Sequence, residues 1–225
     1  MGISKFAKNT GEKSSLAGDP GVAVELRVRR SHSERREEAE QRMLEAAVDI
    51  VAERGLEELT LAECGQAAGY SRGLAAHYFG CKEDLTAAIA THIVTDYGRR
   101  QQAGGRSKRG LQGLLDAVSF YIESGSRNLK SVRAFHAVLG SSLKQTKLSA
   151  AIARLNSDSV AGFAGAIRDG IAIGEIRDNV NPTAQGALII AALRGVISQW
   201  LLDPTIDLEA VRLELLNNLR HSLAR

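Results

Sequence analysis

Prolines are scarce in this chain, and their positions leave most of it free to form helices. The 225 residues include three prolines, at positions 20, 182 and 204. Between residues 21 and 181, therefore, no missing backbone N–H interrupts a helix. The same region is rich in Ala, Leu, Arg and Glu, which favour helix. These features predict an all-α fold, and 44% hydrophobic residues is typical of a globular protein of this length.

A short capped helix is predicted at the start of the segment 60–79. Thr60 precedes Glu63 by three residues, which is the spacing of a capping box. The helix is therefore expected to begin at Leu61. Gly69 is expected to end it, because glycine adopts the left-handed backbone conformation at little cost.

A second short helix is predicted directly after a turn. Ser71 is expected to cap it, and it would run over residues 72–79 until Gly80 ends it. Two short helices joined by a glycine-containing turn form a helix-turn-helix, whose second helix can enter the major groove of DNA. The same spacing also occurs in an ordinary structural corner, so the pattern by itself leaves both interpretations open.

The wider segment 60–85 resembles the DNA-binding region of the tetracycline-repressor (TetR) family of bacterial regulators. The phrases AGYSRG and HYFGCKEDL are the most specific part of this likeness, which covers residues 35 to about 95. The resemblance implies a three-helix N-terminal head and a helical C-terminal body that binds a small-molecule effector and dimerises. Many members have Leu-Tyr where this chain has Ala75 and Ala76, so a tyrosine contact to phosphate is not expected here.

Three regions are expected along the chain. Residues 1–30 lack periodicity and predict a flexible tail, residues 31–80 a helix-turn-helix DNA-binding domain, and residues 81–225 a helical regulatory and dimerisation domain. Ser33 is expected to cap the first helix, which would run to Arg54. In the body, helices are predicted from Cys81 or Lys82 to about Gln102, over residues 111–122, 129–139 and 148–174, from Pro182 to Leu202, and after Asp207.

Eight residues are candidates for contacts to double-stranded DNA. At the start of the second short helix, Arg72, Gly73 and Leu74 are expected to face base edges, where an arginine can bind guanine through two hydrogen bonds. The expected phosphate contacts are Thr60, Ser71, His77, Tyr78 and Lys82.

The effector cavity is implied by the family resemblance rather than by residue spacing. In the family the middle helices enclose such a cavity, and the candidates to line it in this chain are Phe120, Tyr121, Phe135, His136 and Phe163. Simple core packing is the alternative for each of them. No cofactor is expected. The apolar surface of the last two helices fits either the core of one chain or a four-helix interface between two chains, and the resemblance favours a homodimer.

The net charge of +3 gives no site by itself, because the excess of basic residues lies within residues 1–30. Cys64 and Cys81 lack the spacing of a metal or redox motif, and the five histidines show no metal-ligand spacing. Residues 186–202 are the most apolar segment, but they include Arg194 and fall short of a membrane span. A cytoplasmic protein without a membrane role is expected.

The resulting hypothesis is a dimeric transcriptional regulator, most simply a repressor, that binds an inverted repeat and is released by a small molecule. One alternative is a helical adaptor that has lost sequence-specific DNA reading. Another is a serine hydrolase, since residues 69–73 match the pattern GxSxG. That chemistry requires a strand before Ser71, whereas the sequence predicts a helix there, so no enzyme activity is expected.

Overall fold

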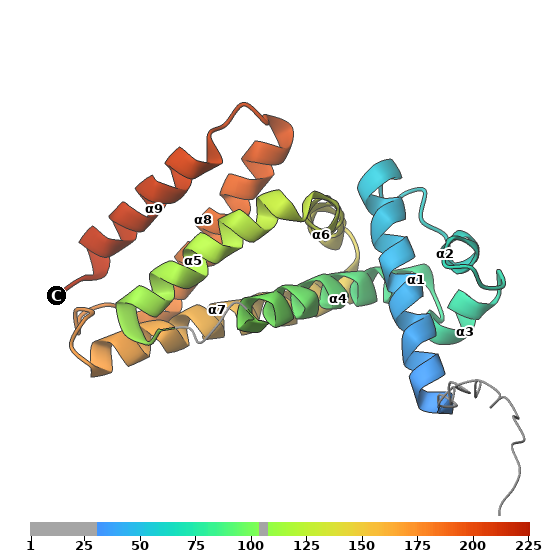
Figure 1. Cartoon of the computed structure of the whole chain (residues 1–225), viewed down its shortest axis with the longest axis horizontal. Coiled ribbons are helices and arrows are strands. Elements are labelled where there is room, and N and C mark those ends of the chain that lie inside the picture. Colours follow the sequence, from blue (N-terminus) through green and yellow to red (C-terminus); the bar gives the residue numbers. More distant parts are fainter. Residues whose placement is uncertain (1–30, 104–107) are drawn as a thin grey trace, which may run out of the picture.

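Helices account for the regular structure of this protein. The computed structural model describes residues 31–103 and 108–225, so the expected tail 1–30 and residues 104–107 lie outside the described residues. The described part forms nine α-helices and one isolated antiparallel bridge, between Ile176 and Ala224 (Figure 1). The all-α prediction is confirmed. The helices are α1 (His32–Arg54), α2 (Leu61–Ala67), α3 (Leu74–Phe79), α4 (Lys82–Ala103), α5 (Gly110–Arg127), α6 (Leu129–Ser142), α7 (Thr146–Ala172), α8 (Pro182–Leu202) and α9 (Leu208–Leu223).

The molecule is elongated, with helices α1, α2 and α3 at one end and α9 with the C-terminus at the other (Figure 1). We call α1–α3 the head and α4–α9 the body. Helix α4 leaves the head and packs along α7, and α6 packs directly on α1. Both α4 and α6 therefore touch the head while belonging to the body.

Three of the predicted helix starts are confirmed by their hydrogen bonds. The hydroxyl of Thr60 accepts from the backbone N–H of Glu63 at 3.1 Å. The side chain of Asn181 accepts from the N–H of Ala184 at 3.1 Å, one residue ahead of Pro182. The carboxylate of Asp207 accepts from two N–H groups of α9. Each side chain satisfies donors that have no partner within the helix.

Two predicted caps are wrong. The cap of α1 is Ser31 rather than Ser33: Ser31 accepts from the N–H of Glu34 at 3.1 Å, and the Glu34 carboxylate accepts from the Ser31 N–H at 2.6 Å. Ser71 does not cap α3, because its carbonyl accepts from the N–H of Leu74 at 3.1 Å and closes a turn. That turn delays the helix to Leu74, so Arg72 and Gly73 lie before it rather than in it.

The buried residues form two clusters. The first cluster joins the head to the adjoining parts of α4, α6 and α7, and it includes Met43, Leu59, Leu85, Phe135 and Leu148. The second lies within the body and is built from α5, α7, α8 and α9. Because the first cluster crosses the head and body, movements of α4 and α6 must affect how the head is held.

Helices α7 and α8 approach each other closely at Gly186. A methyl group on this residue would lie 2.8 Å from the carbonyl oxygen of Val160. By length and composition, α8 is the one helix among the described residues that could span a membrane, which differs from the sequence-based expectation. Its face carrying Ile189, Leu193 and Ile197 is buried within the protein, as in the core helix of a folded body.

Candidate DNA interface and effector cavity

The turn between α2 and α3 is closed by a pair of hydrogen bonds. The N–H of Tyr70 donates to the carbonyl of Gly65 at 2.8 Å, and the N–H of Gly69 donates to the carbonyl of Gln66 at 3.0 Å. Gly69 has a φ of +81°, as the sequence predicted. Together these bonds form a Schellman motif, which ends α2 and fixes the direction in which the chain continues.

Gly65 was not singled out from the sequence, although it determines how closely the turn packs on α2. A methyl group on Gly65 would lie 2.6 Å from the backbone oxygen of Ser71. This approach is closer than a carbon atom tolerates, so the turn can take this position only if residue 65 is glycine. A glycine in the middle of a helix that is only seven residues long was the available signal.

The first candidate base contacts are presented to solvent. Arg72 and Gly73 are exposed, and nothing lies within 4 Å of a methyl group built on Gly73. Leu74 differs from them, since it is half-buried and packs against the first core cluster. Of these three residues, Arg72 is therefore the one whose side chain can extend to a base edge.

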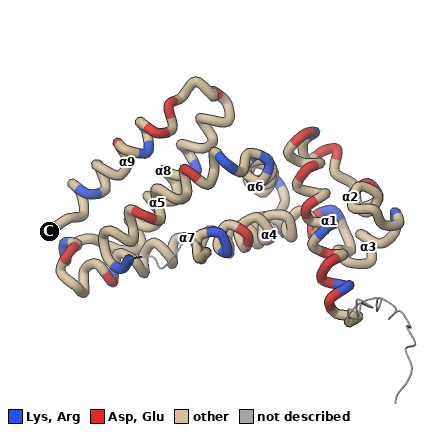
Figure 2. Tube along the Cα trace, in the orientation of Figure 1, with Lys and Arg blue, Asp and Glu red and all other residues tan. Residues whose placement is uncertain are grey.

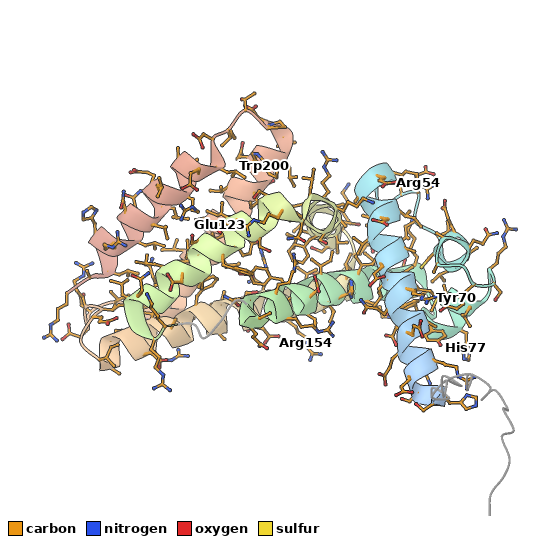
Figure 3. All side chains as sticks on the ribbon, viewed as in Figure 1. Arg54, Tyr70, His77, Glu123, Arg154 and Trp200 are labelled. Atoms are coloured by element: carbon orange, nitrogen blue, oxygen red, sulfur yellow. The ribbon has the colours of Figure 1, made fainter. Side chains whose placement is uncertain are left out.

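The candidate phosphate contacts have different environments. Ser71 and His77 are exposed, and Figure 3 shows His77 at the edge of the head beside α1. Tyr78 is half-buried, and the guanidinium of Arg36 lies 5.6 Å from the centre of its ring, which ties α3 to the start of α1. Thr60 already uses its hydroxyl as the α2 cap. Lys82 donates to the carbonyl of Glu57 at 3.0 Å, which holds its ammonium group beside the head.

Charge does not mark the interface by itself. Figure 2 shows acidic and basic residues mixed along α1. Two arginines of the head pair with glutamates, Arg42 with Glu38 and Arg54 with Glu63. The Glu63 carboxylate therefore faces Arg54 rather than returning to Thr60. Arg72 makes no ion pair with another described residue, so its charge remains available to a ligand.

A cavity of about 690 Å³ lies in the body between α4, α5, α6, α7 and α8. Most of its wall is apolar, and this volume falls within the range of small-molecule sites. Of the five predicted lining residues, Tyr121, Phe135, His136 and Phe163 border the cavity. Phe120 is not among its lining residues and packs instead against Tyr97, with 5.4 Å between ring centres.

The lining residues that the sequence analysis missed include Tyr97, Arg100 and Arg194. Arg194 had a detectable signal, because it is the single charged residue in the most apolar segment of the chain. Its guanidinium lies 5.6 Å from the ring centre of Phe135, and its Nη1 donates to Asn156 at 2.8 Å. Tyr97 and Arg100 follow the end of the apolar pattern of α4, where the sequence gives no reason to expect a cavity wall.

Burial shifts the titrating groups of the cavity toward their neutral forms. It raises the pKa of Tyr121, although the charge of Arg194 opposes this shift, and it raises the pKa of Tyr97. The pKa of His136 is lowered by burial first and by the charge of Arg194 second. His136 is therefore neutral at pH 7.

Helix α6 connects the cavity to the head. Its residues Phe135 and His136 border the cavity. In the first turn of the same helix, the ammonium of Lys130 contacts two carboxylates of α1, Asp49 at 2.9 Å and Glu53 at 3.1 Å. A ligand that displaces α6 would therefore pull on the helix that supports the helix-turn-helix.

The two thiols are protonated at neutral pH. Burial raises the pKa of Cys64 to about 11. The pKa of Cys81 is raised chiefly by its hydrogen bond to the Asp84 carboxylate, contrary to the lowering that a helix start would suggest. Residues 31–103 and 108–225 contain no group of His, Cys, Asp and Glu side chains that could hold a metal ion.

The head matches a known family. Residues 43–89, which include all of α2 and α3, match the family described as bacterial regulatory proteins, tetR family. The head of this chain is therefore similar to the DNA-binding region of that family. Its members are regulators rather than enzymes. The GxSxG interpretation is thus wrong, and the structure gives the physical reason: helix α2, rather than a strand, precedes Ser71.

Relatives within the family differ in how much of the chain they match. The regulator BetI of Brucella canis is 37% identical over 57 residues, so the match covers 25% of this chain and less than a third, 29%, of that relative. Two solved structures share the fold along most of the chain. A protein of Saccharomonospora viridis in complex with choline has a TM-score of 0.72 at 19% identity, covering 84% of this chain and 99% of that one. FadR of Bacillus subtilis in complex with stearoyl-CoA has a TM-score of 0.68 at 19% identity, covering 80% and 97%.

Proposed function

We propose that this protein is a DNA-binding transcriptional regulator that acts as a homodimeric repressor in the cytoplasm and is released by a small molecule. The observation that carries the proposal is the exposed Arg72 in the turn just before α3, in a helix-turn-helix whose sequence matches the tetR family. We assign DNA reading to residues 31–80, and effector binding and dimerisation to residues 81–225.

The proposed DNA contacts of these residues follow from how exposed each side chain is and whether it already has a partner. Arg72 would contact base edges in the major groove, with Gly73 allowing a close backbone approach and Leu74 supporting the start of α3 from within. Ser71 and His77 are exposed and would contact phosphates, together with the hydroxyl of Tyr78. Thr60 and Lys82 already have partners within the head, so we expect them mainly to position the helices and to add weaker phosphate contacts.

Exposed leucines on the last two helices support a dimer. Leu188 and Leu202 of α8 are 64% and 80% exposed, and Leu213 of α9 is 49% exposed. A two-fold axis through these helices would bury such side chains and form a four-helix interface. The two heads would then bind the two half-sites of an inverted repeat, with the half-sites about 34–36 Å apart or more.

Release follows from linkage between the two sites. An effector that binds best when the heads are wrongly spaced for DNA weakens DNA binding by the same factor by which DNA weakens effector binding. Helices α4 and α6 support such coupling, because both border the cavity and both pack on the head. The FadR and Saccharomonospora viridis structures hold ligands on the same fold, which is consistent with this mechanism.

The test begins with selection of bound fragments from the source genome, followed by affinity measurements on the best fragment. We expect Arg72→Ala to cost about 1–3 kcal/mol and to relax the preference at one base position of each half-site. His77→Ala should weaken binding to all sequences alike, as expected for the loss of a phosphate contact. Arg154→Ala is the matched control, since Arg154 is an exposed arginine of α7 outside the head (Figure 3). Unchanged base preference in Arg72→Ala would contradict the assigned role, and the absence of any selected sequence would contradict the function itself.

A further inference from the structure

The cavity combines aromatic walls with two half-buried arginines, Arg100 and Arg194. Tyr97 and Tyr121 meet edge to face, with ring centres 5.6 Å apart, and Phe163 completes this apolar part of the wall. Arg100 and Arg194 come from α4 and α8, so the guanidinium groups enter from different helices. An apolar cavity with few polar groups is typical of a site in which those polar groups orient the ligand.

Each of the two guanidinium groups is held in place and still has an unused donor. Arg194 donates through Nη1 to Asn156 at 2.8 Å, while its buried Nε has no hydrogen-bond partner. Arg100 is paired through Nε with the Asp96 carboxylate at 3.1 Å, while its buried Nη1 has no partner. Buried donors are nearly always satisfied in folded proteins, so these two positions call for an acceptor.

The sign of the charge in the cavity identifies the kind of acceptor. The one acidic residue on its wall, Asp158, is exposed to solvent and therefore screened. His136, beside Arg194, carries no charge at pH 7 because burial lowers its pKa. Asp96 offsets the charge of Arg100, whereas Arg194 has no carboxylate partner among the described residues. The uncompensated charge on the wall is therefore that of Arg194, and a negatively charged group there gains both hydrogen bonds and charge attraction.

We propose that the effector is an amphipathic anion. Its carboxylate is held by Arg194, with Arg100 as a second contact to the carboxylate, and its apolar body packs against Tyr97, Tyr121 and Phe163. The inference rests on the proposed function only for its regulatory consequence, since the binding of such a molecule is measurable without DNA.

A quaternary ammonium ligand such as choline is the main competitor, because aromatic rings also bind such cations. In this cavity Arg194 already lies 5.6 Å from the ring centre of Phe135. A second cation there would be repelled by Arg194 and would leave its Nε unsatisfied. The same aromatic residues therefore favour an anion in this chain.

The experiment is calorimetric titration of the full-length protein with matched probes. Octanoate and biphenyl-4-carboxylate test a chain and a ring body, and each is compared with the corresponding primary alcohol and trimethylammonium compound. We expect at least one carboxylate to bind about 10- to 150-fold more tightly than its alcohol, which is the range for one hydrogen bond to a charged group. The ammonium compounds should bind more weakly than the alcohols.

Variants locate the contact. Arg194→Met should remove the preference for the carboxylate while keeping the apolar wall, and Arg194→Lys should restore part of it, since lysine keeps the charge but lacks the fork of donors. Arg154→Met changes an exposed arginine of α7 outside the cavity and should leave the preference intact. Melting temperatures would show that each variant is folded.

Three outcomes would overturn the inference: neither carboxylate binds, the alcohol or ammonium compound binds as tightly, or Arg194→Met keeps the preference. In any of these cases a selected operator sequence that still depends on Arg72 would leave the proposed function standing. Conversely, carboxylate binding with no operator would support the cavity assignment and reject the regulator.

Discussion

Replacement of Gly65 by alanine tests whether the close contact between α2 and the turn positions Arg72. The added methyl group would lie 2.6 Å from the carbonyl oxygen of Ser71, whereas ordinary contacts lie at 3.4–4 Å. The turn must therefore move by about 1 Å, and the neighbour that moves is backbone rather than a flexible side-chain end. Arg72 follows Ser71 directly, so its position must change as well.

Two opposing effects set the expected change in the free energy of unfolding of Gly65→Ala. Alanine is favoured over glycine inside a helix by roughly 0.5–1 kcal/mol. Overpacking of a close contact costs typically about 1–3 kcal/mol. The free energy of unfolding should therefore fall by about 1 kcal/mol, and a chain of this size should lose about 2–4 °C of melting temperature. Misplacing Arg72 in both half-sites removes about 1–3 kcal/mol of base contact at each, so operator affinity should fall more than stability does.

Urea denaturation and fluorescence anisotropy on the selected operator measure the two effects separately. Gly140→Ala is the matched control, because Gly140 lies in α6 and a methyl group there meets nothing within 4 Å. This control should be slightly stabilised and should bind DNA normally. If Gly65→Ala behaves like Gly140→Ala in both assays, the close approach does not constrain the turn and the reasoning fails.

Three further predictions concern coupling, stability and pH. Lys130→Met should leave the melting temperature almost unchanged, because the ion pairs to α1 are exposed. It should reduce the factor by which an effector weakens operator binding. If that factor is unchanged, Lys130 does not contribute to the coupling between the effector cavity and the head. Asp207→Ala should lower the free energy of unfolding by about 0.5–2 kcal/mol in urea denaturation, and Asp207→Asn should restore most of the loss; equal loss in both would show that the cap does not stabilise α9. Burial lowers the folded-state pKa of His92 and His136, so the unfolded chain takes up protons first on acidification, and stability should fall below about pH 6.5. Denaturation at pH 7.5 and 5.5 checks this, and His136→Gln should flatten the difference.

Local residue chemistry fixed many helix ends in advance. Thr60, Asn181 and Asp207 cap their helices as predicted, because a short polar side chain at that position satisfies backbone N–H groups only a few residues away. Gly69 takes the positive φ expected of it. The errors at Ser33 and Ser71 are also local: two serines compete at the start of α1, and the turn after α2 uses the Ser71 carbonyl instead of its hydroxyl.

The sites depended on contacts that no local pattern encodes. Arg72 was recognisable from the helix-turn-helix, but the need for glycine at position 65 arises from a backbone atom six residues away in a folded turn. Tyr121 and Phe135 were recognisable as aromatic residues on middle helices, whereas the role of Arg194 appears only when α4 and α8 enclose the same cavity. The sequence by itself determined the all-α class, the caps at Thr60, Asn181 and Asp207, and the presence of the helix-turn-helix, since these follow from interactions within a few residues. The cavity, the placement of Arg100 and Arg194 on its wall, and the contact of α6 with α1 were decided by tertiary structure, because long-range packing alone selects which side chains lose water and which partners they meet.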